Sequence, residues 1–480
     1  MKRLAILFFL MYSSAYAQES WPPKYMDMRF MENWNRDTEK DSIAMARDWS
    51  DKVKNLYLSS NKTVWAAFGG QVRLRYMGTI NEEFKESNSG LFTMRARLHS
   101  EFNFGRHFRV FAEGIYSNTT NDDDERIGGG SPVDKGALLN LFAEGSFELS
   151  ENAKLMTWFG RREIQWGHER MLSPGNWLMT RRSWDGGGVS LDWKDYSFDW
   201  FLANPVIVVP DGYSTRDSET LLWGVRMKTV QSEYSPVAGL GGTSWSRHQK
   251  LLFEPYFINA QRKDVVFQQS TDSDHRNTFG LLLAGPISNS PVDFEFEGMY
   301  QIGNHGSSEI RAYSLTAELG ITFDKLHSRP HLWIAGDYSS GDKDSDDEEL
   351  GTFDPLYPQV STWFGEHGLI DRKNLLALSA NLDFEPIPSM MLRLTYWNLN
   401  RSEEADAVYN TSGGILRPAN GSSSKDLGDS FQFSTTYEPS YHWQLTFTYN
   451  YWNPGTFFSD TQDTRALVQH FLMITTQYTF

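Results

Sequence analysis

The segment VDFEFEGMYQ, residues 292–301, alternates apolar and polar side chains along its length. Successive residues of a strand point to opposite faces of a sheet, so Phe294 and Phe296 share one face while Glu295 and Glu297 share the other. In a soluble sandwich the apolar face would meet a second sheet, whereas in a membrane barrel it meets lipid and the polar face meets water. The period of two therefore predicts a β-strand with one apolar and one solvated face.

About eighteen segments of this kind follow one another, from residues 71–76 to residues 469–480, and the connections between them alternate between short and long. Long polar connections are expected at residues 118–137, 260–278, 339–374 and 399–426. Short turns on one side and long loops on the other are typical of bacterial outer-membrane barrels. The predicted fold class is all-β: a transmembrane antiparallel β-barrel of about 18 strands over residues 68–480.

One connection, Val230–Lys250, breaks the alternation because it is long where a short turn is expected. It is either a gate or plug, or it contains a further hairpin. Its sequence favours neither interpretation.

The N-terminus has the pattern of a secretory signal. Two basic residues precede an apolar run at residues 4–11, and an Ala-Tyr-Ala cleavage pattern ends at Ala17. The run is too short to span a bilayer as a helix. We expect residues 1–17 to be a signal peptide and residues 18–67, which lack strand alternation, to be a periplasmic N-terminal extension.

The composition supports a membrane barrel. Aromatic residues make up 15% of the chain, including 17 Trp and 21 Tyr, and suit the aromatic girdles at the membrane interfaces. The mean hydropathy of −0.50 excludes a helical membrane protein, and the formal net charge of −16 argues against a nucleic-acid binder. The chain has no cysteine, which excludes disulfides and thiolate metal sites.

Charged side chains on the polar faces are predicted to point into the lumen. The first three strands place five arginines there: Arg73, Arg75, Arg95, Arg97 and Arg109. In a ring of about eighteen strands the opposite wall is the eleventh strand, which presents Asp293, Glu295 and Glu297. Successive inward residues lie roughly 6.6 Å apart, which suits the charge spacing of a polyuronate, and guanidinium groups bind carboxylates bidentately. Alternatively, these charges only solvate a water-filled pore and pair across strands.

Two segments, GRREIQWG at residues 160–167 and RRSWDG at residues 181–186, resemble a strand end and return of the alginate export porins, the AlgE-like family. The pattern there is Gly-Arg-Gln-Glu followed by Arg-Arg-Ser-Phe-Asp-Gly, so Arg162 and Trp184 are departures, and the first adds positive charge. Further likeness lies in residues 68–76, 106–113, 340–344, 351–358 and 452–457.

This resemblance implies an 18-stranded outer-membrane channel with an arginine-rich constriction that exports an anionic polysaccharide, alginate in the namesake. By motif match it assigns pore-lining roles to Arg73, Arg75, Arg161, Arg181, Arg182 and Asp185. Alternatively, Arg181, Arg182 and Asp185 form an ion-paired anchor of the loop. The chain departs from the family at residues 438–442, where a short turn replaces a long periplasmic loop.

We therefore expect an outer-membrane channel that passes anionic polysaccharide, alginate or a related polyuronate, for export. The alternative is a nutrient-uptake porin for small anionic solutes or sugar acids, which the same basic wall would serve. A monomer is expected, with uronate oligomers, outer-membrane lipid and periplasmic secretion proteins as partners, and no nucleic acid.

An enzyme is not expected. Hydrolase nucleophile patterns and paired-His zinc motifs are absent, and His305, His367 and Asp371 are scattered over predicted outer loops. No cofactor or metal site is predicted. The run Asp342–Asp346 has alternating carboxylates but lacks the Gly and distal Glu of an EF-hand loop, so it is either a solvated loop or a calcium site.

Overall fold

The computed structural model describes residues 25–32, 34, 49–120, 133–210, 212–229, 251–288, 290–359 and 361–480. Two features predicted from the sequence, the signal peptide at residues 1–17 and the long connection at residues 230–250, lie outside the described residues. No helix in the described part of the chain is long and apolar enough to cross a membrane.

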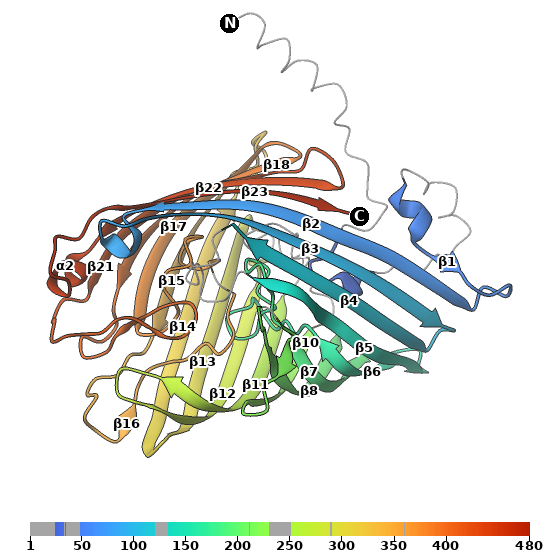
Figure 1. The fold of residues 1–480 in the computed structure, drawn as a ribbon, viewed down its shortest axis with the longest axis horizontal. Coiled ribbons are helices and arrows are strands. Elements are labelled where there is room, and N and C mark those ends of the chain that lie inside the picture. The colour runs from blue at the N-terminus through green and yellow to red at the C-terminus, as the bar shows by residue number, and fades with distance from the viewer. Residues whose placement is uncertain are drawn as a thin grey trace, which may run out of the picture.

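Eighteen antiparallel strands form a closed barrel, because β2 pairs with β3 on one side and with β23 on the other (Figure 1). The strands are β2 (Val64–Ile80), β3 (Asn88–Phe104), β4 (Phe108–Thr119), β5 (Asp134–Ser150), β6 (Ala153–Arg162), β7 (Trp184–Trp193), β8 (Tyr196–Ile207), β10 (Leu221–Thr229), β11 (Leu252–Val266), β12 (Thr271–Pro286), β13 (Val292–His305), β14 (Ser308–Thr322), β15 (His331–Ser339), β17 (Leu375–Ile387), β18 (Met390–Asn400), β21 (Asp426–Tyr437), β22 (Trp443–Pro454) and β23 (Gln469–Thr479). This confirms the predicted fold class.

Short elements lie in the connections and near the N-terminus. They are η1 (Arg29–Met31), η2 (Ser50–Val53), β1 (Leu56–Tyr57), η3 (Glu82–Phe84), β9 (Thr215–Arg216), β16 (Glu349–Leu350), β19 (Val408–Tyr409), β20 (Ile415–Arg417) and α2 (Thr456–Asp460).

The strand β13 shows the two faces of the barrel wall. Phe296 and Tyr300 on the outward face are 37% and 48% exposed, while Glu297 and Gln301 on the inward face are 2% and 0% exposed. Tyr300 lies opposite Tyr313 of β14, which is also exposed, so neighbouring strands share the same orientation. The outward apolar face is left for lipid, and the inward polar face is covered by other parts of the chain.

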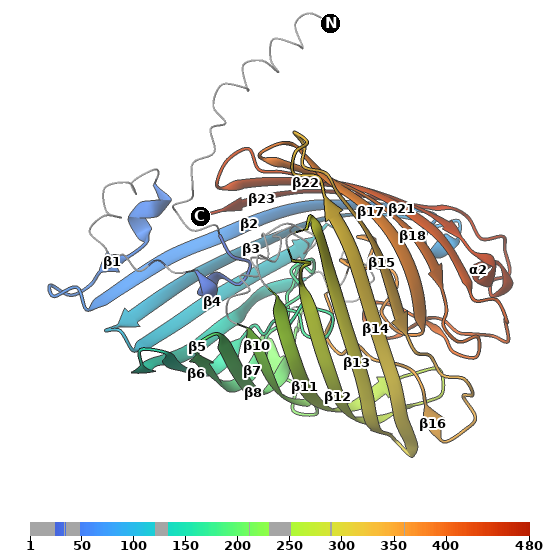
Figure 2. The same cartoon turned by 180° about the vertical axis from the view of Figure 1, so that it is seen from behind.

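Short turns lie at one end of the barrel and most long connections at the other. Figure 2 shows β1 and the C-terminus near the first end, and β16 and α2 near the second. Loops at residues 340–374 and 401–425 confirm two predicted long connections. The predicted loop at residues 260–278 is wrong, because β11 and β12 pair through most of it and leave only the turn 267–270.

Two long connections fold into the barrel. Loop 163–183, between β6 and β7, reaches the inward face of β2 through Arg73 and the inward face of β13 through Glu297. Loop 340–374, between β15 and β17, packs against it through a parallel bridge between Leu172 and Tyr357. The lumen is therefore occupied by the chain itself.

The N-terminal segment, defined as residues 25–32 and 34, also lies inside the wall. Phe30 packs edge-on against the rings of Phe111 and Phe142 on β4 and β5. Tyr25 and Trp34 form a second buried cluster with residues of β2. The segment thus contacts inward-facing residues near the end that carries the short turns.

Cysteine labelling tests the predicted orientation, in which the long loops face the cell exterior. Because the natural chain has no cysteine, each introduced thiol is unique. An Asp346→Cys variant, at an exposed position of loop 340–374, should react with an impermeant maleimide on intact cells. A Lys325→Cys variant, in an exposed short turn, should react only after the outer membrane is broken. The reverse pattern would contradict the orientation.

Candidate functional site

Three arginines form a continuous basic wall on β2 and β3. Arg73 lies directly opposite Arg95 in the strand register, and Arg75 is the next inward residue of β2. All three side chains are at most 1% exposed. Their position follows from the strand period, because alternate residues of each strand face the lumen.

Loop 163–183 covers this wall with its backbone. Three guanidiniums donate to three successive backbone carbonyls: Arg73 to Asn176 at 2.6 Å, Arg75 to Trp177 at 2.6 Å and Arg95 to Leu178 at 2.9 Å. The turn that presents these carbonyls begins at Gly175, whose φ of +68° lies in the left-handed region that favours glycine. The carbonyls stand where water or a ligand would bind in an open pore.

Asn176 is the centre of these contacts. Its side-chain oxygen accepts hydrogen bonds from Arg73 at 2.9 Å, Arg95 at 3.3 Å and Arg181 at 2.9 Å. One neutral amide oxygen therefore accepts hydrogen bonds from three guanidinium groups.

The basic wall holds three cations close together, with the carboxylates of Asp27 and Glu366 near it. Within the described residues, Arg73, Arg75 and Arg95 bind only neutral acceptors on loop 163–183 and neighbouring strands, and none forms an ion pair with a carboxylate. Like charges repel strongly at short range where water is excluded. Such a wall attracts anions.

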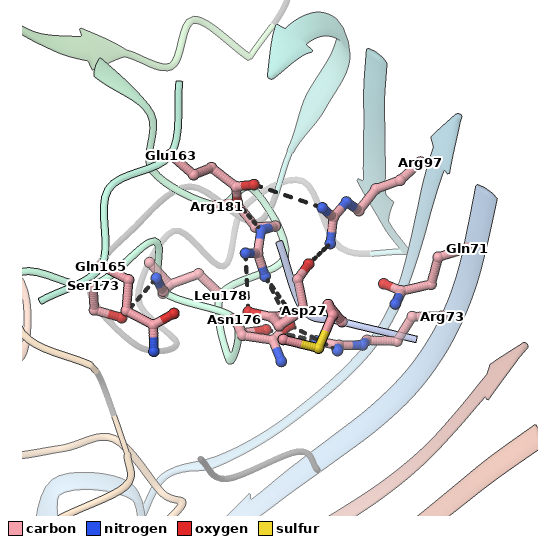
Figure 3. A network of polar contacts seen from close by, with 12 residues as sticks. Asp27, Gln71, Arg73, Arg97, Glu163, Gln165, Ser173, Asn176, Leu178 and Arg181 are labelled. Carbon is pink, nitrogen blue, oxygen red and sulfur yellow. Dashed lines mark hydrogen bonds and ion pairs between the residues drawn. The ribbon is translucent and has the colours of Figure 1, made fainter. Parts of the chain in front are cut away.

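A second group of charges, below called the charge cluster, lies beside the wall (Figure 3). Arg97 pairs with Glu113 at 2.9 Å and lies 3.7 Å from Glu163. Arg181 pairs with Glu163 at 2.5 Å and with Asp27 of the N-terminal segment at 3.0 Å. The cluster therefore joins β3, β4, loop 163–183 and the N-terminal segment.

Arg170 connects the same loop to the opposite, acidic wall. Its guanidinium pairs with Glu295, with Glu297 at 2.9 Å and with Glu318 at 2.6 Å. It also stacks over the ring of Trp363 in loop 340–374, at 3.9 Å from the centroid. Acidic residues of β13 and β14 thus lie in the lumen, but the loop stands between them and the basic wall.

The two inner loops hold each other through backbone contacts. Ser173 donates its backbone N–H to the carbonyl of Tyr357 at 2.8 Å, and Tyr357 donates to the carbonyl of Met171 at 3.0 Å. Arg182 donates to the carbonyl of Pro358 at 2.6 Å. Arg182 therefore anchors one loop to the other.

The remaining predicted site residues lie elsewhere. Arg109 pairs with Glu144 at 2.8 Å and donates to the carbonyl of Phe30, and Asp293 lies 3.1 Å from His331. Both are on the inward face, outside the basic wall.

The structure places Arg161 and Asp185 outside the lumen. They form a bidentate pair at 2.7 and 2.8 Å. Arg161 lies opposite Leu141 in the register, and Leu141 is 45% exposed on the outward face. Phe159, two residues before Arg161, is 77% exposed on the same face. The structure therefore does not place Arg161 and Asp185 in the pore, where the sequence predicted them. Because side chains alternate along a strand, the neighbouring Arg162 faces the lumen instead.

The sequence matches the family described as alginate export over residues 64–468. The chain belongs to the alginate export family. A comparison with curated proteins finds no match. Together with the porin-like barrel, the alginate export family places the protein in the bacterial outer membrane as a channel.

Solved porins share this fold at low sequence identity. Pseudomonas aeruginosa OccK8 (OprE) matches with a TM-score of 0.56 and 12% identity, covering 86% of this chain and 98% of that one. OpdK of the same species, solved with vanillate, matches with a TM-score of 0.56 and 8% identity at the same coverage. Acinetobacter baumannii OccAB2 matches with a TM-score of 0.55 and 11% identity, covering 86% and 98%. These matches show the barrel fold.

Four lumen residues of this alginate export family member were missed in the sequence. Asp27, Glu163, Arg170 and Asn176 all lie outside the predicted strands or at their ends. Glu163 lies within the motif at residues 160–167, which was a usable signal, and Arg170 lies between the two motif segments. No sequence signal pointed to Asp27 or Asn176, because their contacts are made between segments far apart in sequence.

Removing Arg170 should loosen loop 163–183. An Arg170→Gln variant leaves three carboxylates facing one another, and losing one partner of a buried ion pair costs about 3 kcal/mol. We expect more frequent high-conductance openings in planar bilayers. Arg311→Gln, at an exposed arginine, is the control. Wild-type behaviour of both variants would contradict an anchoring role.

Glu366 of loop 340–374 should make loop packing pH-dependent. Burial raises its pKa to about 7 from 4.5, although Arg75 nearby lowers it. The packed loop thus keeps a proton that a released loop loses, so packing is strongest at low pH and weakens as pH rises from 4.5 to about 7. Open probability should rise between about pH 4.5 and about pH 7 and level off above that, and the rise should shrink in Glu366→Gln. An unchanged pH response in that variant would contradict this assignment.

Proposed function

We propose that the barrel exports an anionic polysaccharide, alginate or a related polyuronate, across the outer membrane. The observation that carries this proposal is the basic wall of Arg73, Arg75 and Arg95, which has no carboxylate partner among the described residues. Membership of the alginate export family supports the same class of substrate.

Carboxylates of the polymer would replace the carbonyls of loop 163–183. A hydrogen bond between a guanidinium and a carboxylate is roughly twice as strong as one to a neutral acceptor. The exchange also neutralises charges that repel one another on β2 and β3. Inward residues lie roughly 6.6 Å apart along a strand and about 4.8 Å apart across strands, so several carboxylates of one chain meet several guanidiniums.

Many replaceable contacts allow transport. Binding must be strong enough to draw the polymer in and weak enough at each site to release it. The neutral acceptors of the loop return when the carboxylate moves on, so no guanidinium is left without a partner during passage.

Uptake of small anionic solutes is the second candidate function. Its support is the filled lumen, since a small solute needs less displacement of the two inner loops than a polymer does. The structural likeness to OpdK, solved with vanillate, agrees with this candidate at the level of fold. Block by uronate oligomers separates the two, because it should strengthen with chain length only if a polymer binds several subsites.

The basic wall should determine block by polyuronates. In an Arg73→Gln, Arg95→Gln double variant the fold should persist, because lumen-facing substitutions avoid lipid. The two lost contacts together contribute roughly 1.4 kcal/mol in a wet pore, so block of the ion current by oligouronates should weaken about tenfold.

The control for this variant is Arg329→Gln, which removes a charge from an exposed short turn. It should be blocked like the wild type. Equal block of the double variant and the wild type would contradict the proposed substrate contact.

A further inference from the structure

Asp27 enters the lumen from the N-terminal segment and reaches the middle of the barrel wall. Its backbone carbonyl accepts a hydrogen bond from Arg97 at 3.1 Å, and Arg97 lies near the middle of β3. Its carboxylate binds Arg181 with two parallel hydrogen bonds, both 3.0 Å long. The Asp27 side chain is 14% exposed and that of Arg181 is fully buried.

This bidentate geometry is how a guanidinium binds a free carboxylate ligand. Asp27 is supplied by a segment that belongs to no barrel strand, whereas Glu163, the other partner of Arg181, directly follows β6. Asn176 completes the subsite, since its side-chain oxygen accepts from the same Nη1 of Arg181 at 2.9 Å. Burial would raise the pKa of Asp27, but Arg181, Arg97 and Arg95 together lower it below 3.8, so the carboxylate is charged at neutral pH.

We propose that Asp27 is an internal ligand in a carboxylate-binding subsite formed by Arg181, Arg97 and Asn176, and that a uronate carboxylate takes its place when the N-terminal segment withdraws. This inference rests on the proposed function for the identity of the incoming carboxylate. The role of the N-terminal segment as a plug does not depend on the identity of that carboxylate.

Apolar contacts keep the segment in place at rest. Met28 and Phe30 are 6% and 2% exposed and pack with Phe111 and Phe142. Arg162 stacks over the ring of Phe30, at 4.6 Å from the centroid. Withdrawal exposes these side chains to water, which favours the plugged state until a competing anion compensates.

The position of the segment suits export. It contacts the barrel near the end that carries the short turns and the C-terminus, where Arg29 donates to the carbonyl of Phe480 at 3.1 Å. In the predicted orientation this is the periplasmic end. A polymer leaving the periplasm therefore meets the plug before the basic wall.

The first test removes the internal charge. An Asp27→Asn variant keeps the side-chain shape and should raise the open probability several-fold in potassium chloride alone. It should also strengthen block by oligomannuronate about tenfold, because no internal carboxylate competes for Arg181. Glu32→Gln is the matched control, since Glu32 lies in the same segment but pairs with Arg29, away from the subsite.

The second test fixes the segment in place. Asp27→Cys and Asn176→Cys place two thiols around Nη1 of Arg181, where the native oxygens are 3.0 and 2.9 Å from that nitrogen. A short bis-methanethiosulfonate cross-linker, which forms a disulfide with each thiol and releases methanesulfinate, should close the channel, and a reductant that cleaves these disulfides should reopen it. A bridged channel that conducts like its reduced form would overturn the plug.

The outcomes separate this inference from the proposed function. If Asp27→Asn conducts like the wild type, the plug is overturned. If it opens the channel but oligomannuronate blocks it no more strongly than it blocks the wild type, the exchange of Asp27 for a uronate carboxylate is overturned. If oligomannuronate blocks neither the wild type nor any variant, the proposed function is contradicted as well, and the plug stands only where Asp27→Asn still opens the channel in potassium chloride.

Discussion

The burial of Arg73, Arg75 and Arg95 on one stretch of wall is the constraint on which the interior of this barrel depends. A buried guanidinium must find acceptors, and here no carboxylate of the described residues supplies them. Loop 163–183 therefore lies against β2 and β3 with three successive carbonyls turned toward the cations. The far side of this loop then meets the acidic wall, where Arg170 pairs with three carboxylates.

Local charge, and not net charge, decides what such a lumen attracts. The chain carries a formal charge of −16, yet much of its acidity lies in exposed loops such as residues 343–349. Inside, three carboxylates pair with Arg97 and Arg181 in the charge cluster, and three more pair with Arg170, whereas the arginines of the basic wall form no ion pair among the described residues. A low-dielectric wall concentrates the electric field of these three arginines in the lumen. The same field explains why an internal carboxylate, Asp27, is drawn to the middle of the barrel.

Strands and their faces were predictable because lipid outside and polar contacts inside impose a period of two. Inward placement of Arg73 and Arg95 follows directly from it. The course of loop 163–183 was not predictable, because its contacts use backbone carbonyls, which every residue has. The prediction for Arg161 was wrong for a different reason. The motif resemblance assigned this residue to the pore, but Arg161 lies two residues after the outward-facing Phe159 and therefore also faces outward. Periodicity was the better guide there, because it follows from backbone geometry.

Ion selectivity tests the central claim most directly, because it reports the sign of the charge that permeating ions meet in the lumen without any assumed substrate. The measurement is the reversal potential of the open channel in a planar bilayer under a potassium chloride gradient. A basic wall that forms no ion pair among the described residues predicts that chloride permeates better than potassium despite the net charge of −16. A channel that clearly prefers potassium would contradict this account.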